Sequence, residues 1–374
     1  MKASINPFVL AGYVSREYFC DRETELNWLE DQTMNDRNMV LYSWRRMGKT
    51  SLIHCFAELL EKEFQAELIY IDLMGVRNMQ DTIKAIARAV HNKYGRKSGG
   101  ISKTLGNLAS RLGMSISFDP VSGIPTATFG LTTPSPPEHS LEAVAEFLAG
   151  RKKKIVLAMD EFQQISRFSE TNAEAVFRSW MQGNPKLRFI FSGSQRNLMR
   201  SMFSEQNRPF YKSTQMLDLR PIPLNAYSQF IDKNFKTASK TINASAIEKI
   251  YDWSRGQTYT IQLLCNKAFS ARQPVNAEGL QRICDEILEQ EKPVFYNYMN
   301  MLTNTQWDLL RAIGLSEPVS SPYSKAFITA HGLGAQSSVS GALHALIEKE
   351  LVIKENDQYY LHDVVLSRWF QQQA

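Results

Sequence analysis

The sequence predicts an α/β protein in which a parallel sheet with helices on both faces is followed by a small helical domain and a C-terminal winged helix. Three observations support this fold class. From position 38 to about 222, short apolar runs alternate with segments of helical spacing, which is typical of a parallel sheet with crossover helices. After Pro221 and Pro223 the pattern becomes helical only. Near the end, three helical segments precede a pair of short strands.

Five short runs within the first region are expected to form the sheet. They are Asn38–Ser43, Glu67–Leu73, Ile155–Met159, Leu187–Ser192 and Met216–Leu219. The run Ile155–Met159 is apolar at every position, as a strand covered on both faces requires. Apolar residues at helical spacing over Ser51–Phe64 and Asp81–Tyr94 predict two of the crossover helices.

One segment, at about 112–132, interrupts this order. Apolar and polar residues alternate over Met114–Phe118 and again over Ala127–Leu131, with a turn containing Pro and Gly between them. The pattern predicts a β-hairpin insertion that ends in the proline-containing linker Pro134–Pro137. The hairpin is either a contact surface or a packed elaboration of the sheet domain.

The remaining residues divide into two further domains. Four helices are expected over 223–295, at Asn225–Phe235, Ser245–Trp253, Tyr259–Ser270 and Ala277–Glu291. Over 296–374 we expect helices at Asn304–Ile313, Ser324–Ala330 and Ser337–Glu350, then strands Leu351–Lys354 and Gln358–Leu361. Three helices and a two-stranded wing predict a winged helix, so the expected domains are 1–222, 223–295 and 296–374.

Bulk composition agrees with a globular protein. The chain has 374 residues, 43% of them hydrophobic, which suffices for one large core and smaller domains. No run approaches the roughly 18 apolar residues of a membrane span, and the N-terminus carries no basic region followed by a hydrophobic stretch. We therefore expect no membrane partner and a cytoplasmic location. The four cysteines are scattered, which favours buried thiols over a metal site or disulfide framework.

The formal charge of +5 is modest, but basic residues cluster in two places. Between Lys93 and Phe118 no acidic residue occurs, and Lys152, Lys153 and Lys154 follow Arg151 directly. The first cluster also contains Arg96, Lys97, Lys103 and Arg111. Both clusters are compatible with a polyanion such as DNA, but the pattern favours a solvated face.

The strongest chemical signal lies between the first predicted strand and the following helix. Ser43, Trp44, Arg45, Arg46, Met47, Gly48, Lys49 and Thr50 match G-x-x-x-x-G-K-[ST] except at the first position. Backbone N–H groups of such a loop surround phosphate oxygens, and Gly48 allows their close approach. Lys49 would neutralise the β- and γ-phosphates, Thr50 would bind Mg²⁺, and the helix start at Ser51 would direct its dipole at the anion. These residues predict a P-loop NTPase domain.

A second signal is the pair Asp160 and Glu161, which the apolar strand Ile155–Met159 delivers at its C-terminal end. Ligands of open α/β sheets bind at that edge. Asp160 would hold Mg²⁺, because a hard cation prefers carboxylate oxygen. Glu161 would orient or deprotonate the attacking water. The alternative is a pair of solubilising acids.

A third set of polar residues follows the strand Leu187–Ser192. Ser194 is expected to polarise the water or the γ-phosphate, and Arg196 to bind the γ-phosphate in a bidentate way. The alternative is a helix cap with a surface arginine. Arg208 is a further candidate for an arginine finger.

Together these motifs resemble the archaeal-type ATPase branch of the AAA-related and STAND P-loop NTPases. The residues that carry the resemblance are Asn6–Phe8, Cys20–Leu26, Arg45–Leu52, Asp160–Gln163, Gly193–Arg196 and Arg208–Tyr211. The resemblance implies the same order of P-loop domain, helical lid and winged helix.

The resemblance also implies contacts with a nucleotide beyond the phosphates. The segment that contains Asp21 and Arg22 would pack beside the adenine, and a lid motif at Gly256–Tyr259 would close over the nucleotide. Thr258 stands where the family usually has proline, which leaves base contacts from Tyr259 open. No base-reading motif of GTPases occurs, so ATP is the expected nucleotide, with Mg²⁺.

Two functions remain open at this point. One is a hydrolysing ATPase that acts as a nucleotide-driven switch on a protein or nucleic-acid partner, and the other is an ATP-binding regulatory module with negligible turnover. The C-terminal domain bears on the partner. Residues 296–374 contain five basic and seven acidic side chains, and the presumed recognition helix has no basic residue before Lys349. This balance opposes phosphate binding and favours a protein partner, while DNA and an oligomeric state stay open.

Overall fold

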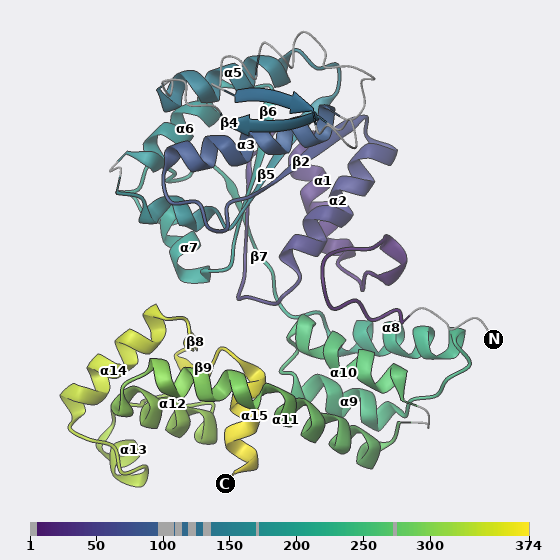
Figure 1. The fold of residues 1–374 in the computed structure, drawn as a ribbon. Coiled ribbons are helices and arrows are strands. Elements are labelled where there is room, and N and C mark those ends of the chain that lie inside the picture. Colours follow the sequence, from purple (N-terminus) through teal and green to yellow (C-terminus); the bar gives the residue numbers. More distant parts are fainter. Residues whose placement is uncertain are drawn as a thin grey trace. The chain divides into compact units, whose positions relative to one another are not determined.

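The computed structural model describes residues 6–95, 108, 114–118, 125–129, 136–169, 172–271 and 275–373. They form two compact units (Figure 1). The sheet unit comprises Ser15–Arg220, and the helical unit comprises Met1–Val14 together with Pro221–Ala374. Among the described residues no helix is both long and apolar enough to cross a membrane.

The sheet unit is built on five parallel strands in the order β2-β5-β6-β1-β7. They are β1 (Met39–Tyr42), β2 (Ala66–Asp72), β5 (Lys154–Asp160), β6 (Leu187–Gly193) and β7 (Gln215–Asp218). All five predicted strands are confirmed within two residues at each end. Every residue of β6 is buried, and only Lys154 of β5 is not, as expected for central strands.

Helices cover both faces of this sheet. They are α1 (Glu23–Met34), α2 (Lys49–Glu63), α3 (Met79–Tyr94), α5 (Pro137–Ala149), α6 (Ala173–Gly183) and α7 (Arg196–Ser204). Figure 1 shows α1 and α2 on one side of the strands and α5, α6 and α7 on the other.

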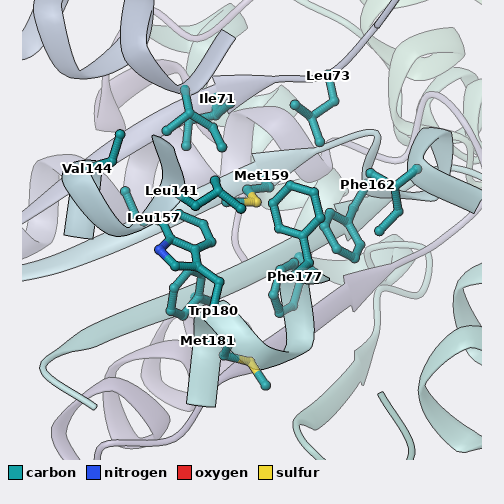
Figure 2. Packing of buried hydrophobic residues seen from close by; sticks show 14 of the residues in the cluster. Ile71, Leu73, Leu141, Val144, Leu157, Met159, Phe162, Phe177, Trp180 and Met181 are labelled. Carbon is teal, nitrogen blue, oxygen red and sulfur yellow. The ribbon is translucent and has the colours of Figure 1, made fainter. Parts of the chain in front are cut away.

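A hydrophobic core lies on the α5 and α6 side of the sheet (Figure 2). There, Leu157 and Met159 of β5 pack with Leu141 of α5 and with Phe177 and Trp180 of α6. Alternate residues of the same strand, such as Ala158, are equally buried, because α2 covers the other face. Because both faces of the sheet are packed against helices, the C-terminal ends of the strands are held in fixed positions. The candidate nucleotide site lies at these ends.

The predicted hairpin is present as an antiparallel pair of β3 (Met114–Phe118) and β4 (Pro125–Phe129). Met114 is opposite Phe129 and Ile116 is opposite Ala127. The residues around this pair that carry most of the first basic cluster, Arg96, Lys97, Lys103 and Arg111, lie outside the described residues, as do Leu131 and Pro134.

The helical unit begins with α8 (Leu224–Thr237), α9 (Ala244–Trp253), α10 (Thr258–Ser270) and α11 (Ala277–Met301). Phe8 from the N-terminal segment packs in this unit. Its ring is 1% exposed and lies 5.8 Å from the ring centroids of both Phe235 and Phe269. The sequence had grouped these N-terminal residues with the P-loop domain, and burial of Phe8 explains why they join the helical unit instead.

Helix α11 is longer than expected. The sequence predicted an end at Glu291, before Pro293, but the helix continues through Pro293 to Met301. Proline removes one backbone hydrogen bond and opposes a helix interior. Phe295 offsets this cost, because its ring is fully buried and lies 5.2 Å from the ring of Trp369. The expected boundary at 295 and 296 therefore falls inside one continuous helix.

The winged helix follows as α12 (Asn304–Ser316), α13 (Lys325–Ala330), α14 (Gln336–Glu348), β8 (Val352–Glu355) and β9 (Gln358–Leu361). The two strands pair antiparallel and confirm the predicted wing. A final helix, α15 (Val364–Gln372), was not predicted. Asp363 caps it by accepting hydrogen bonds from the N–H groups of Val365 and Leu366.

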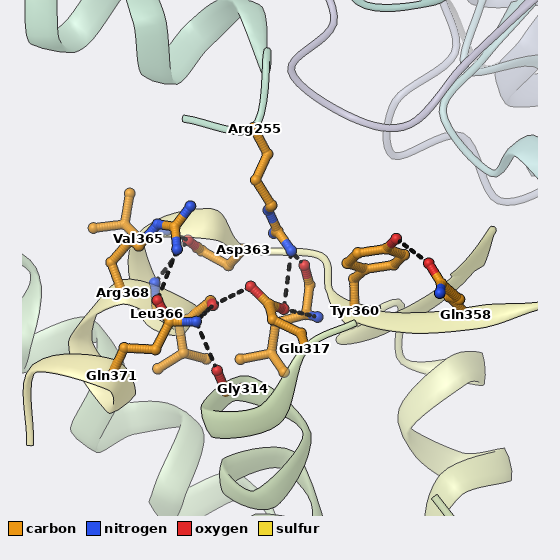
Figure 3. A network of polar contacts seen from close by, with 12 residues as sticks. Arg255, Gly314, Glu317, Gln358, Tyr360, Asp363, Val365, Leu366, Arg368 and Gln371 are labelled. Atoms are coloured by element: carbon orange, nitrogen blue, oxygen red, sulfur yellow. Dashed lines mark hydrogen bonds and ion pairs between the residues drawn. The ribbon is translucent and has the colours of Figure 1, made fainter. Parts of the chain in front are cut away.

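A polar network joins α9 and the turn that follows it to the winged helix (Figure 3). Arg255, in the turn between α9 and α10, lies beside Glu317 and Leu361 of the winged helix. In the opposite direction, Arg368 of α15 donates to the backbone carbonyls of Trp253 and Asp252 at the end of α9. Each part thus contributes one arginine to the other.

Candidate nucleotide site

The predicted phosphate loop lies between β1 and α2, at the C-terminal end of the sheet. Gly48 is the N-cap of α2 and has φ of +90°, a left-handed conformation that glycine adopts without steric cost. Arg46 is also left-handed, with φ of +65°. Such turns ahead of a helix direct successive N–H groups into one concavity, which is an anion-binding geometry.

Lys49 is the first residue of α2 and is 6% exposed. Its Nζ donates to Ser43 Oγ at 3.1 Å and to the carbonyl oxygen of Trp44 at 3.3 Å. Ser43 Oγ in turn donates to the Trp44 carbonyl at 2.9 Å. Ser43, which stands where the motif has glycine, therefore shapes the loop and holds the lysine. The ammonium group is anchored by neutral oxygens inside the phosphate concavity.

The other loop residues lie at different depths. Arg45 and Arg46 are exposed, Met47 is buried, and Ser51 is partly buried in the first turn of α2. The carbonyl oxygen of Met47 accepts a hydrogen bond from Arg22 Nη2 at 3.2 Å. Met47 thus supports the loop through its backbone.

Asp160 ends β5 and is 4% exposed. Its Oδ2 accepts hydrogen bonds from Thr50 Oγ1 at 2.7 Å and from Tyr70 OH at 2.8 Å. The backbone N–H of Glu161 donates to Oδ1 at 3.0 Å. Burial, together with the charge of Asp160, raises the pKa of Tyr70, so its hydroxyl stays protonated and donates.

Thr50 and Asp160 fit a magnesium ion by chemistry. Both present hard oxygen atoms, and they touch each other beside the phosphate loop. Within the described residues no group of three or more His, Cys, Asp or Glu side chains gathers to hold a metal. Mg²⁺ commonly binds through one or two protein oxygens and completes its shell with water and substrate phosphates, which is the arrangement that this pair allows.

Glu161 follows Asp160 in a left-handed conformation with φ of +54°. Its Oε2 accepts hydrogen bonds from Ser194 Oγ at 2.8 Å and from Gln163 Nε2 at 2.5 Å. Ser194 is 3% exposed and Gln163 is fully buried. The structure therefore brings Glu161 and Ser194 together and adds Gln163 as a second donor.

Gly193 allows this cluster to pack. A Cβ at this position would lie 2.3 Å from Gln163 Oε1 and 2.5 Å from Met199 Cγ, which no real contact permits. Gly193 ends β6, so its missing side chain creates the space in which Gln163 reaches Glu161.

Arg196 lies near the phosphate loop but is bound to another residue. Its Nε donates to Asp218 Oδ1 at 3.0 Å and its Nη2 to Asp218 Oδ2 at 2.5 Å. The guanidinium also lies 5.5 Å from the ring centroid of Trp44. Arg208, the alternative arginine, has Nη2 2.7 Å from Glu174 Oε1. Either arginine would have to exchange a carboxylate for phosphate in order to act on a nucleotide.

Arg22 and Asp21 precede α1, both with positive φ. The Arg22 side chain is 3% exposed, and Nη1 donates at 2.7 Å both to Glu25 and to the carbonyl oxygen of Arg220. Together with its bond to Met47, this ties the segment to the phosphate loop. Tyr259 is the second residue of α10, in the helical unit, and is partly buried.

Sequence reasoning missed roles for Tyr70, Gln163 and Gly193. Gln163 and Gly193 occur in motifs that were recognised, but a motif does not show which side chains touch. Tyr70 left a weaker signal. It lies two residues before Asp72, at the end of a strand adjacent to β5, and side chains two apart share a face of a strand.

Comparisons with known proteins identify the family and the fold. A family model described as an ATPase domain predominantly from Archaea matches residues 19–264, and a model described as a probable winged helix domain matches residues 293–372. A search of curated proteins gives no match.

Solved structures show the same fold along the whole chain. A Walker-type ATPase of Pyrococcus abyssi has 19% identity and a TM-score of 0.69, covering 98% of this chain and 99% of its own. The ORC2 protein of Aeropyrum pernix, in complexes with ADPNP and ADP, has 15% identity and a TM-score of 0.60, covering 98% of both chains.

Fold and phosphate loop define this protein as a P-loop ATPase with a C-terminal winged helix. The chain belongs to the family of ATPase domains found predominantly in Archaea.

Proposed function

We propose that this protein binds ATP with Mg²⁺ and hydrolyses it, and that the nucleotide state switches the binding of a protein partner by the C-terminal domain. The observation that carries the proposal is the 2.7 Å hydrogen bond between Thr50 and Asp160. It brings the end of the phosphate loop and the end of β5 together at one edge of the sheet, with Lys49 and Glu161 as their direct neighbours in the chain.

Each residue has a role that its position supports. The N–H groups of residues 45–50 and the Lys49 ammonium bind the β- and γ-phosphates. Thr50 and Asp160 hold Mg²⁺, which neutralises charge on the phosphate oxygens when bound. Glu161 orients a water molecule and accepts its proton as the water oxygen attacks the γ-phosphorus and the bond to the leaving ADP oxygen breaks. Ser194 keeps the Glu161 carboxylate in place.

The first experiment measures Mg²⁺-dependent phosphate release by wild type, Lys49→Ala and Glu161→Gln. We expect Lys49→Ala to lose nucleotide binding. Glu161→Gln should keep ATP affinity within about threefold and lose roughly 10²-fold to 10⁴-fold in turnover, the usual contribution of a general base. Glu63→Gln is a matched control, because Glu63 is an exposed carboxylate at the last residue of α2.

A second candidate function is ATP binding with negligible turnover. It is favoured by the environment of Glu161, whose Oε2 is already occupied by two donors, and by the Arg196 pair with Asp218. Tight, Lys49-dependent ATP binding without phosphate release in wild type would select this candidate and reject hydrolysis.

A protein partner for the winged helix is supported by charge. On α14, His344 lies 3.7 Å from Glu348, and residues 337, 338 and 340 of its exposed face are serines. DNA contacts depend on basic side chains and weaken steeply with salt. We expect no salt-sensitive binding of duplex DNA, and no stimulation of phosphate release by it. Salt-sensitive stimulation of phosphate release by DNA would replace the protein partner with DNA. Separately, the elution volume in size-exclusion chromatography, with and without ATP, would show whether the active form is an oligomer.

A further inference from the structure

A tyrosine outside the recognised motifs contacts the carboxylate proposed to hold magnesium. Tyr70 OH donates to Asp160 Oδ2 at 2.8 Å, and Thr50 Oγ1 donates to the same oxygen at 2.7 Å. The other oxygen, Oδ1, accepts from the N–H of Glu161. Three neutral donors from β2, α2 and the chain after β5 therefore fix one buried carboxylate.

Strand register explains why position 70 reaches this carboxylate. In the parallel pair of β2 and β5, Tyr70 is opposite Ala158 and Asp72 is opposite Asp160. Tyr70 and Asp160 lie on the same face of the sheet, two positions apart along it, because side chains alternate between faces. A phenol is long enough to span that distance, so its hydroxyl arrives at the carboxylate from the neighbouring strand.

A second contact holds the tyrosine ring itself. The ring of His54 lies 4.6 Å from that of Tyr70. His54 is four residues after Thr50 in α2, one helical turn away on the same face. The helix that carries Thr50 thus also contacts the ring of Tyr70. Helix α2 therefore helps to position both hydroxyl groups that donate to Oδ2.

We propose that Tyr70 is a positioning residue for magnesium binding, which holds the Asp160 carboxylate in the orientation that the ion requires. The proposal rests on the proposed function, since it concerns the same nucleotide site. Thr50 would offer a lone pair to the ion while its hydroxyl still donates to Asp160, whereas Tyr70 only donates to the carboxylate oxygen of this pair. Tyr70 is then a donor that keeps Oδ2 in place, and hydrogen-bond partners of metal ligands typically contribute about 10-fold to 100-fold in metal affinity.

The sheet unit contains a matched control. Tyr94 OH donates to Glu67 Oε2 at 2.9 Å. A second, half-buried tyrosine thus donates to a carboxylate, in this case one on β2. Glu67 lies near the beginning of β2, whereas Asp160 aligns with its end. Removing either hydroxyl deletes one tyrosine-to-carboxylate hydrogen bond, but only one of the two is at the site.

The experiment is a magnesium titration of full-length protein with a fluorescent, non-hydrolysable ATP analogue. Affinity for the analogue is measured in EDTA and at increasing Mg²⁺ for wild type, Tyr70→Phe and Tyr94→Phe. We expect Tyr70→Phe to need about tenfold more Mg²⁺ for half-maximal tightening, with its affinity in EDTA within twofold of wild type. Tyr94→Phe should match wild type in both measurements.

The possible results separate this inference from the function on which it rests. If the Mg²⁺ midpoint of Tyr70→Phe equals that of wild type, the positioning role is rejected while the proposed function stands. An equal loss of affinity in EDTA and in Mg²⁺ would also reject it, because that result indicates general disruption of the loop. Absence of any Mg²⁺ effect on wild type would reject both.

Discussion

The guanidinium of Arg255 and the carboxylate of Glu317 form an ion pair with Nη1 and Oε2 2.9 Å apart, and the Glu317 side chain is 4% exposed. Glu317 also accepts hydrogen bonds from the N–H of Leu361 at 3.0 Å and from the Ser367 hydroxyl. Arg255 in turn donates to the Leu361 carbonyl. Burial lowers the pKa of Arg255, and the charge of Glu317 opposes this shift. The turn after α9 is thereby fixed to the winged helix.

Loss of one partner should destabilise the helical unit. Glu317→Gln leaves the Arg255 charge buried without its counterion, which typically costs about 3 kcal/mol. We expect a corresponding drop in the free energy of unfolding, measured by urea titration with a probe in the helical unit. Asp357→Asn is the control, because Asp357 forms an ion pair with Lys354 but is 93% exposed, and exposed pairs contribute little. Equal free energies of unfolding for the two variants would show that the buried ion pair stabilises the protein no more than the exposed one.

Gly193→Ala should disrupt the hydrogen bonds around Glu161, the proposed general base. The added Cβ would overlap Gln163 Oε1, so Gln163 must move and the hydrogen bond to Glu161 is lost. We expect at least a tenfold fall in phosphate release, since misplacement of a catalytic group by about 1 Å costs on the order of 10²-fold. Gly183→Ala is the matched control, because a Cβ there has no atom within 4 Å. Wild-type turnover in Gly193→Ala would argue against a role for this packing.

Stability should fall at acidic pH in part through His91. Burial lowers the pKa of this side chain, whose Nε2 is buried without a hydrogen-bond partner among the described residues. The unfolded chain binds the proton near the ordinary value of about 6.5. Because the unfolded state then carries more protons, stability decreases as pH falls through about 6.5, and the loss levels off below the folded-state pKa.

Comparison with His91→Gln isolates that contribution. Urea titrations at pH 8 and pH 5 should give a smaller difference in unfolding free energy for His91→Gln than for wild type. An identical difference in both proteins would assign the acid sensitivity to other groups.

The cysteines should resist thiol reagents in the folded protein. All four are free and buried, as the scattered spacing predicted, and burial raises the pKa of Cys20 and of Cys284 to about 12. Since the thiolate is the reactive form, we expect Ellman's reagent to modify none of the four quickly in buffer and all four in denaturant. Rapid modification of a single thiol in buffer would reveal local opening around it.

Much of the fold could be predicted from the sequence, because its elements report on local patterns. The strand β5 is apolar at nearly every position, and the loop before Lys49 carries its own motif. Two features depended on distant contacts instead. Phe8 joins the helical unit because aromatic side chains far along the chain surround it, and α11 passes Pro293 because Phe295 is buried against Trp369. The helix α15 was missed although its cap, Asp363, is a local signal.

The candidate site divides along the same line. Lys49, Thr50, Asp160 and Glu161 were found because each stands beside a strand end in a recognisable motif. Their partners were not. Tyr70 was missed because its hydrogen bond to Asp160 depends on strand register. The bond between Arg196 and Asp218 depends on strand order, because Arg196 follows β6 and Asp218 ends β7, and these two strands lie on either side of β1 in the folded sheet.

The N-terminal segment also bears on how the chain is synthesised. Asn6 donates to the carbonyl of Asn266, 260 positions later, and the carbonyl of Phe8 accepts from the Asn266 side chain. At roughly 5–20 residues per second, a ribosome needs on the order of ten to fifty seconds to deliver that partner. Throughout this interval Phe8 has to stay in water or be shielded by a chaperone, while the contiguous sheet unit can fold as soon as it emerges. Completion of the helical unit therefore waits until residue 266 has left the ribosome, long after Phe8 has done so.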